Sequence, residues 1–313
     1  MKDNQKKPVV FLFGPTATGK SDLAIHMAKK FPLDIISVDS VMVYKDCDIG
    51  SAKPDKKILR NYPHELVNVV TPNKIFTVGD FYKISKKLIK KAHLSNKIPF
   101  FVGGSMMYFR SLYHGIHDLP SRDTNYREEL LRLKLANNDN YLYEMLEVID
   151  PNYAKQINEN DEVRIIRALE IYKVSGKTLS DTLKEQDAEI LTDKYYVKQF
   201  GIYAEKDLLD IRIKDRIHNM IDKGLKEEAL ILLKKYNIKL NHPLMKSVNY
   251  KQIFEHIAGN YSLDTFIEKS FFATRQLAKR QRTWIKSWNQ FHSIKLNDQK
   301  VIENNLKNII SFL

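Results

Sequence analysis

A phosphate-binding loop is the first feature of this sequence that could do chemistry. The glycines of the pattern G-x-x-x-x-G-K-[ST] let a backbone wrap an anion, with its N–H groups and the N-terminus of the following helix pointing inward. The lysine of the pattern adds a positive charge, and its final hydroxyl can ligate Mg²⁺. The motif therefore predicts binding of a diphosphate or polyphosphate, without identifying that ligand as ATP. Its residues are Gly14, Pro15, Thr16, Ala17, Thr18, Gly19, Lys20 and Ser21.

A carboxylate follows the second predicted strand. Asp39 comes directly after the apolar run Asp34–Val38. Because carboxyl ends of strands face the ligand crevice in a doubly wound sheet, we expect Asp39 near the phosphate loop. Three roles remain open for it: a Mg²⁺ ligand, a general base, or a cap of the following turn. The other predicted strands end without an obvious acid, which weakens an ATPase interpretation, since ATPases use a separate metal-organising aspartate.

Alternating strands and helices must position these residues. The pattern over the first part of the chain predicts an α/β fold, a P-loop NTPase-like doubly wound parallel sheet. Thr77 is placed to cap a helix that runs to about Leu94, and Ser21–Lys30 has helical spacing. Continuous apolar runs predict strands at Val9–Phe13, Asp34–Val38, Leu66–Val70 and Pro99–Val102.

A helical insertion domain is predicted to interrupt this core. Apolar spacing predicts helices at 126–136, 141–149 and 163–174, and no strand, within residues 115–195. We therefore expect an α/β core of residues 1–114 and 196–313 and an insertion of residues 115–195. The second part of the core is expected to contain a strand at 197–203, helices at 207–223, 226–236, 246–257 and 263–286, a strand at 291–295 and a terminal helix.

Composition narrows the class of protein. Lys and Arg number 51 against 38 Asp and Glu, a net charge of +13 over 313 residues. This excess favours a polyanionic partner, nucleic acid first, although a generally lysine-rich surface would give the same number. The single cysteine, Cys47, excludes an internal disulfide and a multi-cysteine zinc site. The sequence has no run long enough to span a bilayer and no secretory signal in its first residues, so we expect a cytoplasmic protein without membrane partners.

Several stretches together resemble one family, the bacterial tRNA dimethylallyltransferases, also called tRNA isopentenyltransferases. They run in family order across nearly the whole chain, and Asp48–Pro54 and Thr274–Trp284 are far more specific than the phosphate loop alone. The resembling segments are Gly14–Ser21, Ile36–Ser40 with Tyr44 and Lys45, Asp48–Pro54, Val102–Ser105 with Tyr108 and Phe109, Arg164–Glu170 with Ser175–Lys177, Arg212, Arg216, Met220, Gly224 and Leu225, Tyr250–Gln252, and Thr274–Gln281 with Thr283 and Trp284.

The resemblance implies an activity and roles for particular residues. It implies transfer of a dimethylallyl group from dimethylallyl diphosphate to N6 of adenosine 37, next to the tRNA anticodon, with release of diphosphate. Asp39 would be the general base for the adenine amine, Arg216 would bind the diphosphate with Lys20, and Ser105 would take the place of the usual family threonine. The family is described as Mg²⁺-dependent, consistent with Ser21 as a metal ligand.

Contacts to the tRNA anticodon stem-loop are implied in both domains. Arg164 and Arg167 lie three residues apart and share one helix face of the insertion. A basic segment, Lys269–Trp288, is suited to follow an RNA backbone. Asn249 departs from the family, which commonly has glycine there. The predicted tRNA-binding residues are Asp39, Ser40, Val41, Met42, Ser105, Arg127, Arg164, Arg167, Lys246, Tyr250, Lys251, Arg275 and Arg280.

The residue types suit prenyl transfer to an adenine amine, and two other interpretations remain open. The phosphate loop, Lys20 and Arg216 are suited to neutralise the charge that builds on a diphosphate leaving group. One carboxylate suffices to accept the amine proton. Tyr44, Tyr108 and Phe109 could wall the base pocket or only pack in the core. The alternative is a nucleotide-dependent kinase of a small molecule or nucleoside, with the insertion as a lid. A third class is a P-loop RNA-binding NTPase. We expect a monomer.

Overall fold

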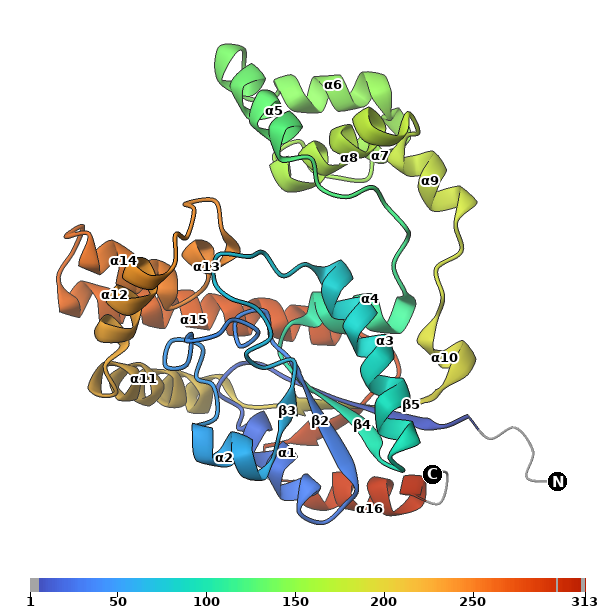
Figure 1. The fold of residues 1–313 in the computed structure, drawn as a ribbon, viewed down its shortest axis with the longest axis vertical. Helices are drawn as coiled ribbons and strands as arrows, with labels where there is room; N and C mark the ends of the chain where they lie inside the picture. The colour runs from blue at the N-terminus through green and yellow to red at the C-terminus, as the bar shows by residue number, and fades with distance from the viewer. Residues whose placement is uncertain (1–5, 297, 311–312) are drawn as a thin grey trace. The chain divides into compact units, whose positions relative to one another are not determined.

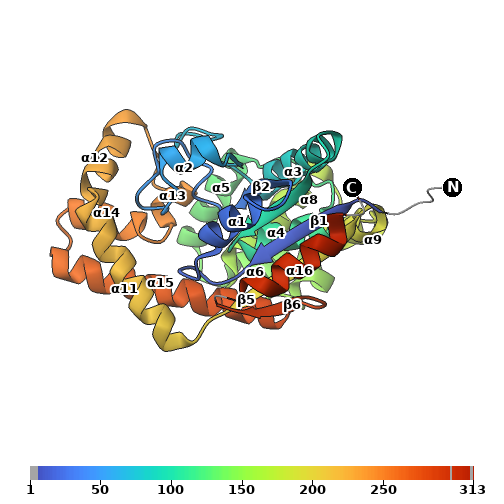
Figure 2. The same cartoon turned by 90° about the horizontal axis from the view of Figure 1, so that it is seen from below.

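Six strands of the described residues form one parallel sheet. In a computed structural model of the chain, which describes residues 6–296, 298–310 and 313, the strand order is β3-β2-β4-β1-β5-β6. Figure 1 labels β2, β3, β4 and β5, and Figure 2 labels β1 and β6. All neighbouring strands pair in parallel. The predicted α/β fold with a doubly wound parallel sheet is therefore confirmed. The strands are β1 Pro8–Phe13, β2 Leu33–Val38, β3 His64–Glu65, β4 Ile98–Gly103, β5 Tyr196–Tyr203 and β6 His292–Lys295.

The pairing register of β1, β4 and β2 brings three loops together. Every residue of β1 is buried, as expected for a central strand covered on both faces. At its carboxyl end Phe13 pairs with Gly103 of β4, which also pairs with Val38 of β2. The phosphate loop, Asp39 and the segment after β4 therefore leave the sheet side by side at one edge, where a doubly wound fold places its ligand crevice.

Helices cover both faces of the sheet. Alternation along β1 sends Val10 and Leu12 into a core with α1 and α16, which lie together on one face (Figure 2). Phe11 and Phe13 point the other way, into a larger core with α3, α4 and the helices after β5. Helix bounds in this part are α1 Lys20–Ala28, α2 Lys56–Asn61, α3 Val78–Leu94, α4 Met106–His114, α10 Leu191–Lys194, α11 Lys206–Asp222, α12 Leu225–Lys235, α13 Pro243–Lys246, α14 Tyr250–Ile257, α15 Leu263–Lys286 and α16 Gln299–Ile310.

The cap predicted at Thr77 is confirmed. Its hydroxyl accepts a hydrogen bond from the Asp80 N–H at 3.1 Å, and the Asp80 carboxylate accepts one from the Thr77 N–H at 2.9 Å. This reciprocal capping box satisfies two N–H groups that have no partner within the helix. It fixes the start of α3, which packs Phe81 and Ile89 against the sheet.

Two predicted elements are wrong, and left-handed backbone explains both. The run Leu66–Val70 is not a strand: Leu66 and Asn68 have φ of 64° and 58°, and only His64–Glu65 pairs with β2. The predicted helix at 246–257 is two helices, α13 and α14. Between them Asn249 has φ of 71°, which an α-helix cannot contain. Apolar content alone did not reveal these turns.

Residues His114–Glu189 form a second compact unit. Its apolar core contains Leu130, Leu142, Leu146 and Leu169. The first unit comprises the remainder of the chain and includes residues 190–195, so the division after the insertion falls six residues before the predicted one. The helices of the second unit are α5 Thr124–Ala136, α6 Tyr141–Ile149, α7 Pro151–Ala154, α8 Glu162–Ser175 and α9 Leu179–Glu185.

The described residues bear on the prediction of no membrane span, but only partly on the prediction of no secretory signal. Across the described residues, no helix has both the length and the apolar character that crossing a bilayer requires. Met1–Gln5, within the segment where no secretory signal was expected, lies outside those residues.

Candidate active site

The phosphate loop joins β1 to α1 and lines a cavity of about 330 Å³. Gly19 directly precedes the helix with φ of 69°, a conformation that favours glycine. The Thr18 hydroxyl donates to the Pro15 carbonyl at 2.8 Å and closes the loop. Because α1 begins inside the motif, its first N–H groups lack acceptors within the helix and are available to an anion.

Lys20 and Arg216 place two cations in this cavity. Lys20 Nζ donates to the Pro15 carbonyl at 2.6 Å. Burial, followed by repulsion from Arg216, lowers the pKa of Lys20 to about 7, against the opposing attraction of Asp39. Burial also lowers the pKa of Arg216, again opposed by Asp39. Two desolvated cations beside one loop form a site that a multiply charged anion would stabilise.

Helix α11 presents two arginines to the phosphate loop. Arg216 donates to the Thr16 hydroxyl at 3.1 Å and to the Ser51 carbonyl at 3.4 Å. One turn earlier, Arg212 donates to the Ala17 carbonyl at 3.4 Å. The four-residue spacing puts both guanidinium groups on one helix face. Arg212 is absent from the predicted site, although its spacing from Arg216 was a readable signal.

Gln281 of α15 ties the phosphate loop to the end of β4. Its Oε1 accepts from the Thr16 N–H at 2.8 Å, and its Nε2 donates to the Gly104 carbonyl at 2.9 Å. A side chain at Gly104 would not fit here, since a Cβ would lie 2.3 Å from Gln281 Nε2. Gln281 belongs to one of the resembling segments, but its sequence context predicted no role for it.

Asp39 caps the turn that follows β2. Its Oδ1 accepts from the N–H groups of Val41 at 2.8 Å and Met42 at 3.1 Å. Within the described residues no hydrogen bond engages Oδ2. One of the three roles left open by the sequence is thus present, and it leaves the second carboxylate oxygen for another task.

Ser105 lies beside Asp39 at the end of the neighbouring strand. Its Oγ accepts from the Ser40 N–H at 3.2 Å, and its N–H donates to the Val38 carbonyl at 3.2 Å. Parallel pairing of β2 with β4 explains this proximity of residues 66 positions apart. Both side chains line a second cavity, of about 510 Å³.

The two cavities adjoin at a shared wall. Thr16, Asp39, Gly104, Arg216, Leu277 and Gln281 line both of them. The smaller cavity contains the phosphate loop. The larger one is mostly apolar beyond Asp39 and Ser105, with a rim that includes Lys246 and Arg280. The apolar side chains that line it include Met106, Tyr108, Ile213, Ile217, Met220 and Trp284. A ligand with an anionic head and an apolar tail would fit across the wall, with Asp39 at the junction.

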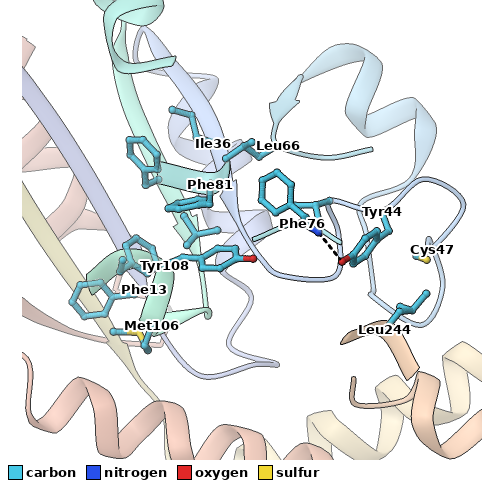
Figure 3. Close-up of a cluster of buried hydrophobic side chains, with 14 of the residues drawn as sticks. Phe13, Ile36, Tyr44, Cys47, Leu66, Phe76, Phe81, Met106, Tyr108 and Leu244 are labelled. Carbon is cyan, nitrogen blue, oxygen red and sulfur yellow. Dashed lines mark hydrogen bonds between the residues drawn. The ribbon is translucent and has the colours of Figure 1, made fainter. Parts of the chain in front are cut away.

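The three aromatic residues predicted near the site differ in position: one lines the larger cavity and two lie in the core. Tyr108 stacks on Phe81, with ring centroids 4.5 Å apart, and lines the larger cavity (Figure 3). Burial raises its pKa, so the phenol stays neutral. Phe109 and Tyr44 are fully buried core residues, and the Tyr44 hydroxyl accepts from the Phe76 N–H at 3.3 Å.

Glu228 of α12 fixes the loop Asp48–Gly50. Its carboxylate accepts three backbone N–H bonds, from Asp48 at 2.8 Å, Ile49 at 2.6 Å and Gly50 at 3.0 Å. It also accepts the Tyr250 hydroxyl at 2.7 Å. Four donors on one carboxylate explain why this loop keeps the Ser51 carbonyl within reach of Arg216. Glu228 is one of two adjacent glutamates in an amphipathic helix, so the sequence gave no signal for this role.

Glu228→Gln is expected to destabilise the protein. An amide has one acceptor oxygen in place of two, so at least one buried N–H or O–H loses its partner, at a cost of about 1–3 kcal/mol. Chemical denaturation should show the lower free energy of unfolding. Glu227→Gln is the matched control, because Glu227 is exposed on the same turn. Equal stability of the two variants would contradict this account of the loop.

Predicted RNA-binding residues of the first unit differ in exposure. Lys246, Lys251 and Arg280 are exposed. Arg275 lies over the Phe271 ring and pairs with Asp210 at 3.2 Å. Tyr250 is completely buried with its hydroxyl on Glu228, so its direct contact with RNA is corrected to a role in supporting the loop.

Two predicted RNA-binding arginines of the insertion surround one buried carboxylate. Glu170 is fully buried and accepts from Arg127 Nε at 2.6 Å and Nη2 at 2.8 Å, and from Arg167. Arg167 also donates to the Pro120 carbonyl at 2.7 Å. Only part of each guanidinium remains for an outside partner. Arg164 is exposed and pairs with Asp161.

These observations define the class of protein. A phosphate-binding loop at the carboxyl edge of a parallel sheet makes this a P-loop NTPase-like α/β protein, and a second cavity adjoins the loop. A family model described as IPP transferase matches residues 42–288. The chain belongs to this family of prenyltransferases.

Solved structures support the assignment. The chain is similar to the tRNA isopentenylpyrophosphate transferase of Bacillus halodurans, with 30% identity, TM-score 0.70 and coverage of 98% of this chain and 97% of that one. The Staphylococcus epidermidis tRNA Δ(2)-isopentenylpyrophosphate transferase gives 30% identity and TM-score 0.67, covering 98% and 99%. A eukaryotic dimethylallyltransferase acting on tRNA gives 27% identity and TM-score 0.79, covering 96% and 77%.

Proposed function

We propose that this protein transfers a dimethylallyl group from dimethylallyl diphosphate to N6 of adenosine 37 of a tRNA, with release of diphosphate. The observation that carries the proposal is the pair of adjoining cavities that meet at Asp39: the smaller contains the phosphate loop with Lys20, and the larger has a mostly apolar lining. The kinase alternative is not favoured, because the family model that matches residues 42–288 is described as IPP transferase. Family membership and the net charge of +13 also favour prenylation of RNA.

The phosphate side of the site stabilises the leaving group. As the bond between the allylic carbon and oxygen breaks, negative charge grows on the diphosphate. The phosphate loop, Lys20 and Arg216 line the cavity in which this charge would develop, so they are placed to stabilise it. The apolar wall excludes water that would otherwise capture the allyl group.

The acceptor side of the site binds the adenine. The target base leaves its stack to enter the larger cavity, as base-modifying enzymes require. The N6 nitrogen forms the new bond to carbon, and its proton moves to Asp39, whose Oδ2 is free of hydrogen bonds to described residues while Oδ1 is fixed by the turn. Ser105 Oγ, already within 3.2 Å of the Ser40 N–H, orients the base beside Asp39.

Ser21 fits a Mg²⁺ ion bound with the diphosphate. The Ser21 hydroxyl lines the cavity of the phosphate loop, and Mg²⁺ prefers few protein oxygens combined with phosphate oxygens and water. When bound, the ion would supply further neutralisation of the diphosphate charge. We further propose a cytoplasmic monomer.

Charge reversal on α15 tests the RNA face. The double variant Arg275→Glu with Arg280→Glu is expected to raise KM for tRNA about tenfold or more and to reduce the salt slope of kcat/KM by about two, because two phosphate contacts are lost. Steady-state kinetics at several salt concentrations measure both. Lys300→Glu on α16 is the control, since α16 packs against the opposite sheet face. A change confined to KM for the prenyl donor would refute the RNA face.

Nucleoside mass spectrometry tests the proposed function directly. Unmodified tRNA incubated with the protein, Mg²⁺ and dimethylallyl diphosphate should yield N6-dimethylallyladenosine. A parallel incubation with ATP and a nucleoside should give no phosphorylated product. The reverse outcome would support the kinase and end the prenyltransferase proposal.

A further inference from the structure

The geometry points to Gln281 as a positioning residue for the diphosphate-binding arginine, an inference that rests on the proposed function. The relay runs from Gln281 Oε1 to the Thr16 N–H at 2.8 Å, and from the Thr16 hydroxyl to Arg216 Nη1 at 3.1 Å. Each bond fixes the group that makes the next one. Gln281 itself is not required to touch the reacting atoms.

Thr16 has an unusual task within the phosphate loop. Its N–H is engaged by the Gln281 side chain, and so points to α15 instead of serving the anion. Its hydroxyl then accepts from Arg216, whose second nitrogen donates to the Ser51 carbonyl at 3.4 Å. The guanidinium is thereby oriented before any ligand binds. Arg216 is desolvated and lowers the pKa of the neighbouring Lys20, so fixed hydrogen-bond partners matter for its position.

The Nε2 group of Gln281 lies next to the cavity that is proposed to bind the adenine. Nε2 donates to the Gly104 carbonyl at 2.9 Å, and Gly104 directly precedes Ser105, which lines the adenine cavity. One buried amide therefore fixes the spacing between the diphosphate site and the base site. Because the Thr16 N–H donates to the amide oxygen and the Gly104 carbonyl accepts from the amide NH2, the hydrogen bonds also settle the orientation of the amide. Gln281 is buried, so water does not readily replace these bonds.

Two substitutions separate positioning from packing. Gln281→Met keeps the length and removes both hydrogen bonds, and we expect kcat to fall about 10²-fold, as for other ångström-scale misplacements of reacting groups. Affinity for inorganic diphosphate should fall with it. Gln281→Glu restores both bonds only when protonated, because a carboxylic acid donates to Gly104 and accepts from Thr16, whereas a carboxylate repels the Gly104 carbonyl. Burial favours the protonated acid.

The readout is the ratio of variant to wild-type protein at each pH. For Gln281→Glu we expect diphosphate affinity and kcat, each divided by the wild-type value, to rise as pH falls from 8.5 to 5.5. For Gln281→Met both ratios should stay low. Protonation of the diphosphate affects the variant and the wild type equally at each pH, so it cancels in the ratio. Gln299→Glu on α16 is the control for the charge change, and melting temperatures confirm that the variants are folded.

Three outcomes decide the inference. It stands if Gln281→Met weakens diphosphate binding and Gln281→Glu recovers at low pH. It is overturned if Gln281→Met binds diphosphate and turns over like the wild type, or if Gln281→Glu is equally impaired at both pH extremes. Diphosphate calorimetry needs no tRNA, so it tests the relay even if prenyl transfer is not observed and the proposed function fails.

Discussion

Asp39→Asn is expected to lower kcat for prenyl transfer by about 10²–10⁴-fold, the usual contribution of a general base. Asparagine keeps an Oδ1 that can accept from the Val41 and Met42 N–H groups, so the turn after β2 should persist. What it loses is the ability to take a proton from the adenine amine. Single-turnover kinetics with saturating dimethylallyl diphosphate and tRNA would measure the chemical step itself.

The controls for this variant separate base catalysis from folding and binding. Diphosphate affinity should change only a few-fold, because loop N–H groups, Lys20 and Arg216 remain. Asp34→Asn, on the same strand, removes a carboxylate that pairs with Lys97 at the surface and should leave kcat unchanged. A normal rate for Asp39→Asn would leave Asp39 as a turn cap only.

Arg216→Gln is expected to reduce kcat by about 10²–10³-fold, the range found when one preorganised donor to a developing anion is removed. Glutamine retains a hydrogen-bond donor but neither the charge nor the reach to both Thr16 and Ser51. Charge on the diphosphate is greatest after the bond between carbon and oxygen breaks. The fold-decrease in kcat should therefore exceed the fold-increase in KM for dimethylallyl diphosphate. Pre-steady-state kinetics can separate the two.

Lys214→Gln provides the matched control for Arg216. Lys214 is exposed on the same helix and lies over the Phe271 ring, away from both cavities. Its replacement should leave kcat and diphosphate affinity near those of the wild type. If Arg216→Gln raised only KM for tRNA, the arginine would belong to the RNA interface and not to the leaving-group site.

Local patterns explain why the sequence predicted one half of the site. Phosphate loop, Asp39 and Ser105 each follow a buried strand, and parallel pairing then brings strand ends together without further information. Apolar periodicity also predicted most helices within a few residues. The predictions failed at Leu66, Asn68 and Asn249 because left-handed residues interrupt otherwise regular patterns, and none of the three is a glycine.

The other half of the site depends on contacts between distant parts of the chain. Gln281 meets Thr16 across 265 residues, and Glu228 meets Asp48 across 180. Nothing in the neighbouring sequence of either residue marks it, since both sit on ordinary amphipathic helices. Resemblance to a family selected the block that contains Gln281, but only the three-dimensional arrangement gives it a task.

The central position of β1 has a consequence for synthesis on the ribosome. One edge of β1 pairs with β4, but its other edge pairs with β5, which is made only after the whole insertion. Until then a fully apolar strand has an open edge, which is a template for aggregation. The insertion, with a core of its own, can fold during this interval, whereas the nascent α/β half must wait for Tyr196–Tyr203 to emerge.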